Sequence, residues 1–341
     1  MEPAESRQAA VLGAGSWGTA LAVQLATVGH AVSLWGRDAA LVGRMAATRQ
    51  NDTYLPGVAL PDVVRPTDSI AGALSGARFV VVAAPSHGLR AVVRAAAPHV
   101  SAGAVLVSAT KGIEPDTLLR MSEVIAEETG GHHAVVVLSG PSFALEVARR
   151  LPTALVAASS DGSAMRAVQD EFRGPYFRLY GSDDVAGVEV GAALKNIIAI
   201  AAGVVESLAL GHNAMAALIT RGLAEISRLS CAMGGRRETV SGLSGLGDLV
   251  LTCTGSLSRN RRVGLELGRG RPLADVLAGM KMVAEGVRTT SAALALGARH
   301  GVELPIAAQM ADVLAGRMPP KDAVGQLMLR RQRDELDGDA G

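Results

Sequence analysis

Residues 9–28 read AAVLGAGSWGTALAVQLATV, and this stretch decides the fold. The apolar residues 9–13 predict a strand, and residues 19–28, which end before Gly29, predict a helix. Between them, Gly13, Gly15 and Gly18 form the pattern GxGxxG. The pattern alone is weak, but a preceding strand and a following helix are the context in which it binds the pyrophosphate of a dinucleotide. We expect Gly13 to allow a tight turn, Gly15 to let the backbone approach the pyrophosphate and Gly18 to let helix and strand pack closely; a purely structural glycine turn is the alternative.

The second predicted strand, residues 31–35, suggests which dinucleotide is bound. Such sites commonly carry an acid after this strand, where it bonds the ribose 2′-hydroxyl. Here Arg37 follows, and an arginine can hold a 2′-phosphate instead. We therefore expect NADP, as NADPH, to be accepted and preferred. Asp38 keeps NAD possible, or it caps the helix predicted over residues 38–49.

The rest of the first half repeats the alternation of strand and helix. Continuous apolar runs at residues 79–84, 105–108, 134–138 and 154–157 are typical of strands in a sheet buried on both faces. Residues 51–66 hold three prolines and are predicted to be a loop, and from about residue 185 the patterns are helical. We predict an α/β fold class: a doubly wound Rossmann-type domain over residues 1–184, an all-α domain over residues 185–330 and a flexible tail over residues 331–341.

Composition excludes several classes of protein. A net charge of +1 is unusual for a nucleic-acid binder, so we expect no nucleic-acid partner. Cys231 and Cys253 form no disulfide framework or CxxC site, which fits a reducing cytoplasm, and residues 1–10 lack the apolar core of a signal peptide. The apolar run over residues 185–210 is long enough to span a membrane, but it contains Glu189, Lys195 and Glu206. We expect a buried helix of a soluble protein there, and no integral membrane association.

Three loops that follow predicted strands carry polar residues. Pro85-Ser-His87 follows one strand, Thr110-Lys111-Gly112 the next, and Gly140-Pro-Ser142-Phe143 a third. The carboxyl ends of parallel strands are where doubly wound sheets bind ligands, so Lys111 is expected to face a ligand rather than solvent. Ser142 either donates to an anion or caps a helix. His87 could be an acid/base residue or simply a loop residue beside the cofactor, and His132-His133 lacks the spacing of a metal site.

The predicted helical domain adds a further set of polar residues. Lys195 and Asn196 interrupt an apolar helix, where a charge must be paired, neutralised or used. The glycine-rich residues 241–255 lead to Ser258-Arg-Asn-Arg-Arg262, whose arginines suit a phosphate monoester, although such runs are usually solvated. Asp248 either pairs with a lysine, bonds a substrate hydroxyl or caps a helix.

Taken in order, GAGSWG, PSHGLR, ATKGIE, SGPSFALEVA, AALKN, GLGDLVLTCTGSLSRNRRVG and VAEGV resemble the bacterial-type NAD(P)-dependent glycerol-3-phosphate dehydrogenases. The resemblance covers about residues 9–329, and its later motifs are more specific than the glycine pattern. It departs only at Gly88-Leu89 and at the charged ends.

The resemblance implies reversible reduction of dihydroxyacetone phosphate to sn-glycerol 3-phosphate, a precursor of phospholipids. It implies that Lys195 is the catalytic proton donor and acceptor. It implies substrate contacts at Lys111, Gly140, Ser142, Lys195, Asn196, Asp248, Thr252, Ser258, Arg259 and Asn260. Cofactor contacts would fall at Ser16, Trp17, Arg37, Lys111, Ala144, Arg259, Val283 and Glu285, in addition to the three glycines.

The expected mechanism places a desolvated Lys195 amine, with a pKa below its usual value, where negative charge develops on the ketone oxygen. Lys111 and Asp248 would orient the amine, and Arg259 and Asn260 would hold the phosphate. The alternatives are another lysine-dependent NADP reductase, of the β-hydroxyacid or ketopantoate type, and a non-catalytic NAD(P) sensor. A homodimer is possible.

Overall fold

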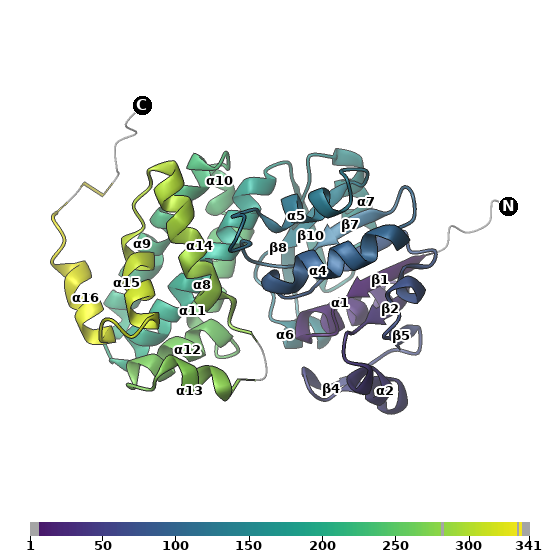
Figure 1. Cartoon of the computed structure of the whole chain (residues 1–341), viewed down its shortest axis with the longest axis horizontal. Helices are drawn as coiled ribbons and strands as arrows, with labels where there is room; N and C mark the ends of the chain where they lie inside the picture. Colours follow the sequence, from purple (N-terminus) through teal and green to yellow (C-terminus); the bar gives the residue numbers. More distant parts are fainter. Residues whose placement is uncertain (1–6, 281–282, 333, 336–341) are drawn as a thin grey trace.

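The computed structural model describes residues 7–280, 283–332, 334 and 335. Residues 1–6 of the segment examined above for a signal peptide, and most of the predicted tail, lie outside this range. The described chain forms two domains (Figure 1). One is a sheet flanked by helices, which we term the sheet domain, and the other is a bundle of helices, which we term the helical domain.

The sheet domain contains ten strands: β1 (Gln8–Leu12), β2 (Ala31–Trp35), β3 (Gln50–Asn51), β4 (Leu55–Ala59), β5 (Val64–Thr67), β6 (Phe79–Val82), β7 (Val105–Ser108), β8 (Val135–Ser139), β9 (Thr153–Ala158) and β10 (Phe177–Ser182). Its α-helices are α1 (Ser16–Thr27), α2 (Ala39–Thr48), α3 (Ile70–Leu74), α4 (Ser86–Ala96), α5 (Met121–Glu128), α6 (Ala144–Ala148) and α7 (Gly162–Phe172).

Eight of these strands form one sheet in the order β10-β9-β8-β7-β6-β1-β2-β5. Strands β5, β2, β1, β6, β7 and β8 run parallel, with Ala9 opposite both Val32 and Phe79, whereas β9 runs antiparallel to β8 and parallel to β10. The parallel strands therefore end at one edge of the sheet, where the three predicted polar loops begin.

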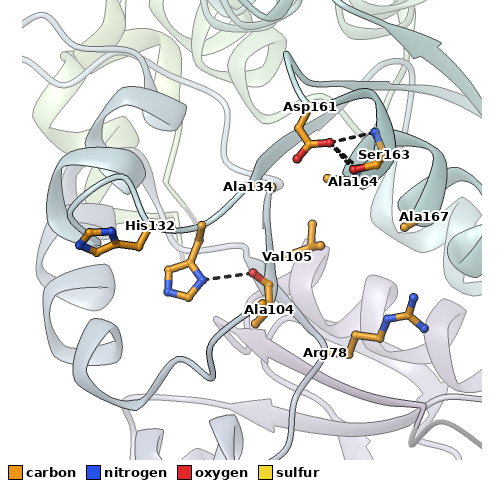
Figure 2. Close-up of a pocket in the computed structure, with 11 residues that line it drawn as sticks. Arg78, Ala104, Val105, His132, Ala134, Asp161, Ser163, Ala164 and Ala167 are labelled. Carbon is orange, nitrogen blue, oxygen red and sulfur yellow. Dashed lines mark hydrogen bonds between the residues drawn. The ribbon is translucent and has the colours of Figure 1, made fainter.

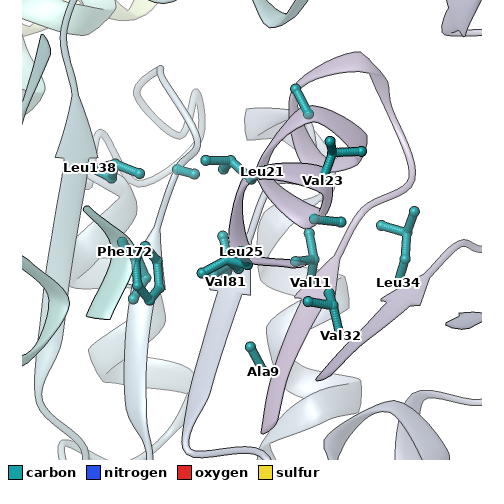
Figure 3. Close-up of a cluster of buried hydrophobic side chains, with 14 of the residues drawn as sticks. Ala9, Val11, Leu21, Val23, Leu25, Val32, Leu34, Val81, Leu138 and Phe172 are labelled. Carbon is teal, nitrogen blue, oxygen red and sulfur yellow. The ribbon is translucent and has the colours of Figure 1, made fainter. Parts of the chain in front are cut away.

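The sheet is buried on both faces, as the apolar runs predicted. Along β1, Val11 belongs to one hydrophobic cluster and Leu12 to another on the opposite face. Figure 3 shows the first cluster, in which Leu21 and Leu25 of α1 pack over Val11 and Val81 of the sheet. The Rossmann-type fold class is confirmed.

Two regions of the sheet domain differ from the expectation. The predicted loop over residues 51–66 contains β4 and the start of β5, which pairs with β2 at the edge of the sheet. Pro66 can lie in β5 because an edge strand need not donate every backbone N–H group. Strand β10 was not predicted, because its residues alternate between buried and exposed and so lack the continuous apolar run of the central strands.

The regular structure of the described residues from Val185 onward is helical: α8 (Val185–Ser207), α9 (Gly211–Ala232), α10 (Arg237–Val240), a π-turn (Leu243–Gly247), α11 (Asp248–Thr254), α12 (Arg259–Gly268), α13 (Leu273–Ala278), α14 (Glu285–His300), α15 (Pro305–Leu314) and α16 (Pro320–Met328). The expected all-α domain is confirmed. Helix α8 is long and apolar enough to cross a membrane, but its most apolar window is entirely buried, as in the core helix of a soluble protein.

Glycines allow α12 to lie directly on α8. A Cβ atom on Gly203 of α8 would lie 2.0 Å from the carbonyl oxygen of Arg261, and one on Gly264 of α12 would lie 1.8 Å from that of Ile200. Both distances are shorter than any van der Waals contact, so the backbones touch where a side chain cannot fit. This packing holds the lysine of α8 and the arginine at the start of α12 in a fixed relation.

Candidate active site

The ammonium group of Lys195 lies at the centre of a buried polar cluster. Lys195 is 5% exposed, and its Nζ donates to Asp248 Oδ1 at 2.5 Å and to Thr252 Oγ1 at 2.6 Å. Asp248 and Thr252 are one turn apart on α11, so both face α8. The sequence left open whether this charge is paired, neutralised or used. The structure shows that it is paired, with Asp248.

Lys111 from the sheet domain reaches the same carboxylate. Its Nζ donates to Asp248 Oδ2 at 2.7 Å and to the carbonyl oxygen of Gly140 at 3.1 Å. Asp248 is 1% exposed and thus lies between two ammonium groups that come from different domains. Lys111, Gly140, Lys195, Asp248 and Thr252 are consequently brought together, and Lys111 is not the surface lysine of a turn.

Burial and charge set the protonation behaviour of this cluster. The pKa of Lys195 is lowered to about 8: burial is the main cause, the charge of Lys111 adds to it, and Asp248 opposes both effects. Burial alone would raise the pKa of Asp248, but the charges of Lys111 and Lys195 hold it below its usual value. The result is a carboxylate that stays ionised beside an amine that can give or take a proton near neutral pH.

Two asparagines join the helices around this cluster. Asn260 Nδ2 donates to Asn196 Oδ1 at 2.9 Å, and Asn260 Oδ1 accepts from the backbone N–H of Gly286 at 3.0 Å. This network fixes the starts of α12 and α14 against α8. Among the described residues, Asn196 Nδ2 makes no hydrogen bond, so its N–H groups are the free donors of the pair.

The arginine cluster divides between two roles. Arg259 makes no hydrogen bond to any described residue, and burial lowers its pKa, opposed by Glu285. Arg261 instead forms an ion pair with Glu206, and Ser258 Oγ caps α12 by accepting from Arg261 N at 3.2 Å. Arg261 is thus engaged elsewhere and Arg262 is exposed, so Arg259 is the half-buried guanidinium of the cluster that has no hydrogen-bond partner among the described residues.

The loop after β8 brings Gly140, Ser142 and Ala144 to the same sheet edge. Ser142 Oγ donates to the carbonyl oxygen of Gly140 at 3.0 Å. Helix α6 begins at Ala144 and its cap position is Phe143, so the alternative that Ser142 caps this helix is wrong.

The glycine loop after β1 has the geometry of a phosphate cradle. Gly13 has φ +127, and a Cβ atom there would lie 2.8 Å from the carbonyl oxygen of Ala83; one on Gly18 would lie 1.9 Å from that of Gly13. A Cβ on Gly15, in contrast, would meet nothing within 4 Å, so its backbone is open to a ligand. Helix α1 begins at Ser16 without a side-chain cap, and the Nε1 of Trp17 has no hydrogen-bond partner among the described residues. Unsatisfied donors around an open backbone fit a dinucleotide pyrophosphate.

The residues after β2 also fit the expectation. Arg37 is exposed at the end of the strand. Asp38 caps α2, accepting from Ala40 N at 2.9 Å and Leu41 N at 3.2 Å, so its carboxylate serves the helix cap. Arg37, in contrast, takes no part in this cap.

Glu285 of the helical domain contacts the sheet domain beside this cradle. It accepts from Ser86 N at 3.1 Å and from Ser86 Oγ at 2.5 Å, at the start of α4. Val283, two residues before Glu285 in the sequence, is half-buried. Sequence reasoning missed Ser86, although its position directly after a strand could have indicated it. His87 is exposed at the same helix start, and burial and then Arg288 lower its pKa.

A pocket of about 430 Å³ lies at the opposite edge of the sheet, where β6, β7 and β8 begin (Figure 2). Its lining includes His132 and His133, and His133 Nδ1 lies 3.2 Å from the carbonyl oxygen of Ala104. Asp161 in this pocket caps α7. Within the described ranges, no group of three or more His, Cys, Asp or Glu side chains could hold a metal ion.

Two family models match the chain, and both describe the same kind of enzyme. Residues 8–165 match the model described as NAD-dependent glycerol-3-phosphate dehydrogenase N-terminus, and residues 184–325 match its C-terminus. A glycerol-3-phosphate dehydrogenase (NAD(P)+) of Syntrophotalea carbinolica is 54% identical over 96% of this chain and 99% of its own length. That of Koribacter versatilis is 56% identical over 80% and 82%. The crystal structure of the Coxiella burnetii glycerol-3-phosphate dehydrogenase superposes with a TM-score of 0.91 at 40% identity, covering 95% of this chain and 99% of that one.

Proposed function

The chain belongs to the NAD-dependent glycerol-3-phosphate dehydrogenase family, and we propose that the cluster of Lys195, Asp248 and Lys111 is its catalytic centre. The activity of this family is the reversible, NAD(P)-dependent reduction of dihydroxyacetone phosphate to glycerol 3-phosphate, which supplies glycerolipid synthesis. The observation that supports the assignment of the centre is the buried Lys195 amine, held by two hydrogen bonds and tuned by a second cation.

A nicotinamide dinucleotide held by the glycine cradle would supply or accept the hydride at the ketone carbon. Lys195 donates a proton to the ketone oxygen during reduction and takes it back during oxidation. Its positive charge stabilises the oxygen as negative charge develops there, which lowers the transition state more than the ground state. Asp248 and Thr252 hold the amine in position, and its burial, with a smaller effect of the Lys111 charge, keeps its pKa low.

The remaining predicted residues bind and orient. We propose that Arg259 and the free amide of Asn196 hold the substrate phosphate, with help from Ser142, so that the carbonyl group meets Lys195. Ser258 and Asn260 support them through the cap of α12 and the asparagine network. The glycine cradle, Ser16, Trp17 and Arg37 bind the dinucleotide. Ala144, Val283 and Glu285 are proposed to complete its site.

A direct assay tests the proposal: NADPH oxidation after addition of dihydroxyacetone phosphate, with unphosphorylated dihydroxyacetone as the matched control. We expect turnover of the phosphorylated ketone to be far faster than the weak reaction of the unphosphorylated one. Similar rates with both ketones, or better turnover of a β-keto acid or ketopantoate, would favour the alternative reductases instead. Cofactor binding without turnover would favour a sensor.

The pKa of Lys195 predicts opposite pH profiles for the two directions. Reduction needs the protonated amine, so its kcat/KM should fall as the pH rises through about 8. Oxidation needs the neutral amine, so its kcat/KM should rise through the same pH. Initial rates in both directions over a range of buffers check this. Parallel profiles would show that another group carries the proton.

Arg37→Ala is expected to change the choice of cofactor. The variant should bind NADPH about tenfold to hundredfold more weakly, because one charge-assisted contact to a phosphate is lost, while NADH binding changes little. Kd values from the quenching of intrinsic fluorescence separate the two cofactors without any turnover. An unchanged Kd for NADPH would remove the assignment of Arg37 to the 2′-phosphate.

Assembly and location are also proposals. A homodimer is supported by exposed apolar side chains in the helical domain, among them Leu210, Met328 and Leu329. A cytoplasmic location is supported by the burial of α8 and by the free thiols of Cys231 and Cys253.

A further inference from the structure

Glu189 connects the lysine helix to the sheet domain. It lies on α8, six residues before Lys195, and is 4% exposed. Its carboxylate accepts three hydrogen bonds from the sheet domain: from Ser122 N at 2.8 Å, Ser122 Oγ at 2.6 Å and Arg120 Nη1 at 2.9 Å. Burying a carboxylate costs free energy unless its oxygens accept hydrogen bonds or pair with a cation. We therefore expect the bonds from Glu189 to Ser122 and Arg120 to persist throughout the folded state.

The partners of Glu189 close the loop that carries Lys111. Arg120 forms an antiparallel bridge with Ile113, and Glu114 N donates to the carbonyl oxygen of Leu119 at 2.9 Å. Residues 111–120 therefore form a closed turn, which we term the Lys111 hairpin. Ile113 of this hairpin is 1% exposed and belongs to the hydrophobic core of the helical domain.

The Lys111 hairpin therefore contacts both domains: Glu114 forms an ion pair with Arg90 of α4 in the sheet domain, and Ile113 packs into the core of the helical domain. Its contact with the helical domain has an apolar part, Ile113 with Leu118 packed against the same core, and a polar part, the bonds to Glu189 of α8. These contacts determine where the ammonium of Lys111 lies relative to that of Lys195, since both bind the carboxylate of Asp248. A misplacement of about 1 Å in such a constellation can cost about a hundredfold in rate.

We propose that Glu189 is a positioning residue for the reaction: by binding Arg120 and Ser122, it holds the Lys111 hairpin against α8 and so sets the spacing of the two lysines around Asp248. The proposal rests on the assignment of Lys195 as the proton donor. Glu189 itself touches neither lysine through any hydrogen bond of the described residues, and acts through the hairpin.

The chain offers a matched control in Glu225. This residue is 3% exposed on α9, and its carboxylate also accepts from the start of another helix, from Ile306 N at 2.6 Å and Ala307 N at 3.4 Å. Those partners begin α15, so Glu225 joins two elements of the helical domain and none of the sheet domain. E189Q and E225Q therefore make the same chemical change at buried carboxylates that accept from a helix start; Glu189 also pairs with Arg120, and only E189Q alters the contact between domains.

The kinetic comparison uses both variants with NADPH and dihydroxyacetone phosphate. E189Q should lower kcat about tenfold to hundredfold and leave the Kd for NADPH within about twofold, because the chemical step and not cofactor binding depends on the spacing. The charged and titratable groups that face the Lys195 amine are Asp248 and Cys253 of α11 and Lys111 of the hairpin. When Lys111 moves away, the pH at which reduction declines should rise, and E225Q should leave this pH unchanged.

Hydrogen exchange supplies a readout that does not depend on turnover. E189Q should increase amide exchange in peptides covering residues 111–120 at least about fivefold, whereas E225Q should increase it around α15 instead. If E189Q does not fold, Ser122→Ala, which removes one donor and leaves the backbone N–H, tests the same link with a smaller effect.

An unchanged exchange rate in the hairpin of E189Q, or an unchanged pH profile with a normal kcat, would overturn the proposal. Equal effects of E189Q and E225Q on the pH profile would also overturn it, since they would show a general loss of packing. Absence of wild-type turnover would contradict the proposed function, and the exchange measurement would still decide whether Glu189 holds the hairpin.

Discussion

Replacement of Lys195 by alanine is expected to lower kcat for reduction of dihydroxyacetone phosphate by about a thousandfold or more. The variant loses both the proton donor and the cation beside the developing oxyanion, and each effect alone contributes about a hundredfold or more. Binding of NADPH should persist within about twofold, because the dinucleotide cradle lies at the ends of β1 and β2 and not on α8. Stopped-flow single turnovers and NADPH fluorescence titrations measure the two quantities separately.

Two controls sharpen this experiment. Lys195→Met keeps the length of the side chain in its buried position and removes the charge, so a loss equal to that of alanine would exclude a packing effect. Asp248 keeps its partner Lys111 in both variants, so the carboxylate is not left unpaired. Added small primary amines should restore part of the activity of the alanine variant. Turnover within about tenfold of wild type would show that Lys195 is not the acid.

Replacement of Arg259 by glutamine is expected to reduce kcat/KM for dihydroxyacetone phosphate by about thirtyfold to a thousandfold. A partly buried guanidinium that binds a phosphate contributes about 2–4 kcal/mol when it is removed from a desolvated site. The weak reaction of unphosphorylated dihydroxyacetone should hardly change, since it makes no use of this contact. Steady-state kinetics with the two ketones show the difference, and the Kd for NADPH reports any share of Arg259 in cofactor binding.

Arg261→Gln is the matched control, because Arg261 lies two residues away and is paired with Glu206. We expect its kcat/KM to stay within about threefold of wild type, with any effect limited to stability. If Arg261→Gln impaired the phosphorylated ketone as strongly as Arg259→Gln, the assignment of the phosphate to Arg259 would be untenable.

The sequence could predict what depends on local pattern. The apolar runs of β6, β7 and β8 indicated a sheet buried on both faces, and the glycine spacing indicated the turn after β1. Strand β10 was not predicted because an edge strand buries only alternate residues, and strand β5 was not predicted because its proline suggested a loop. Both errors concern the edges of the sheet, where pairing with a distant strand overrides local preference.

The candidate site likewise contains features that the local sequence predicts and features that depend on distant contacts. Residue types near strand ends indicated Lys111 and Ser142, but which of them meet depends on contacts between domains. The sequence could not show that Asp248 lies between two lysines, 53 residues from one along the chain and 137 from the other. It also gave no sign that Arg261 faces Glu206, because neighbours on a helix point in different directions.

Glu189 was noted in the sequence only as a charge that argues against a membrane span. Its partners, Arg120 and Ser122, lie 69 and 67 residues earlier, and no local pattern links them. Buried charges within apolar helices therefore point to long-range pairing without identifying the partner.

A crystal structure with NADP+ and glycerol 3-phosphate bound tests the central claim most directly. We expect the Lys195 amine to lie within hydrogen-bond reach, about 2.6–3.2 Å, of the oxygen on the middle carbon, with the phosphate against Arg259. An amine directed away from that oxygen, with another side chain in its place, would contradict the claim.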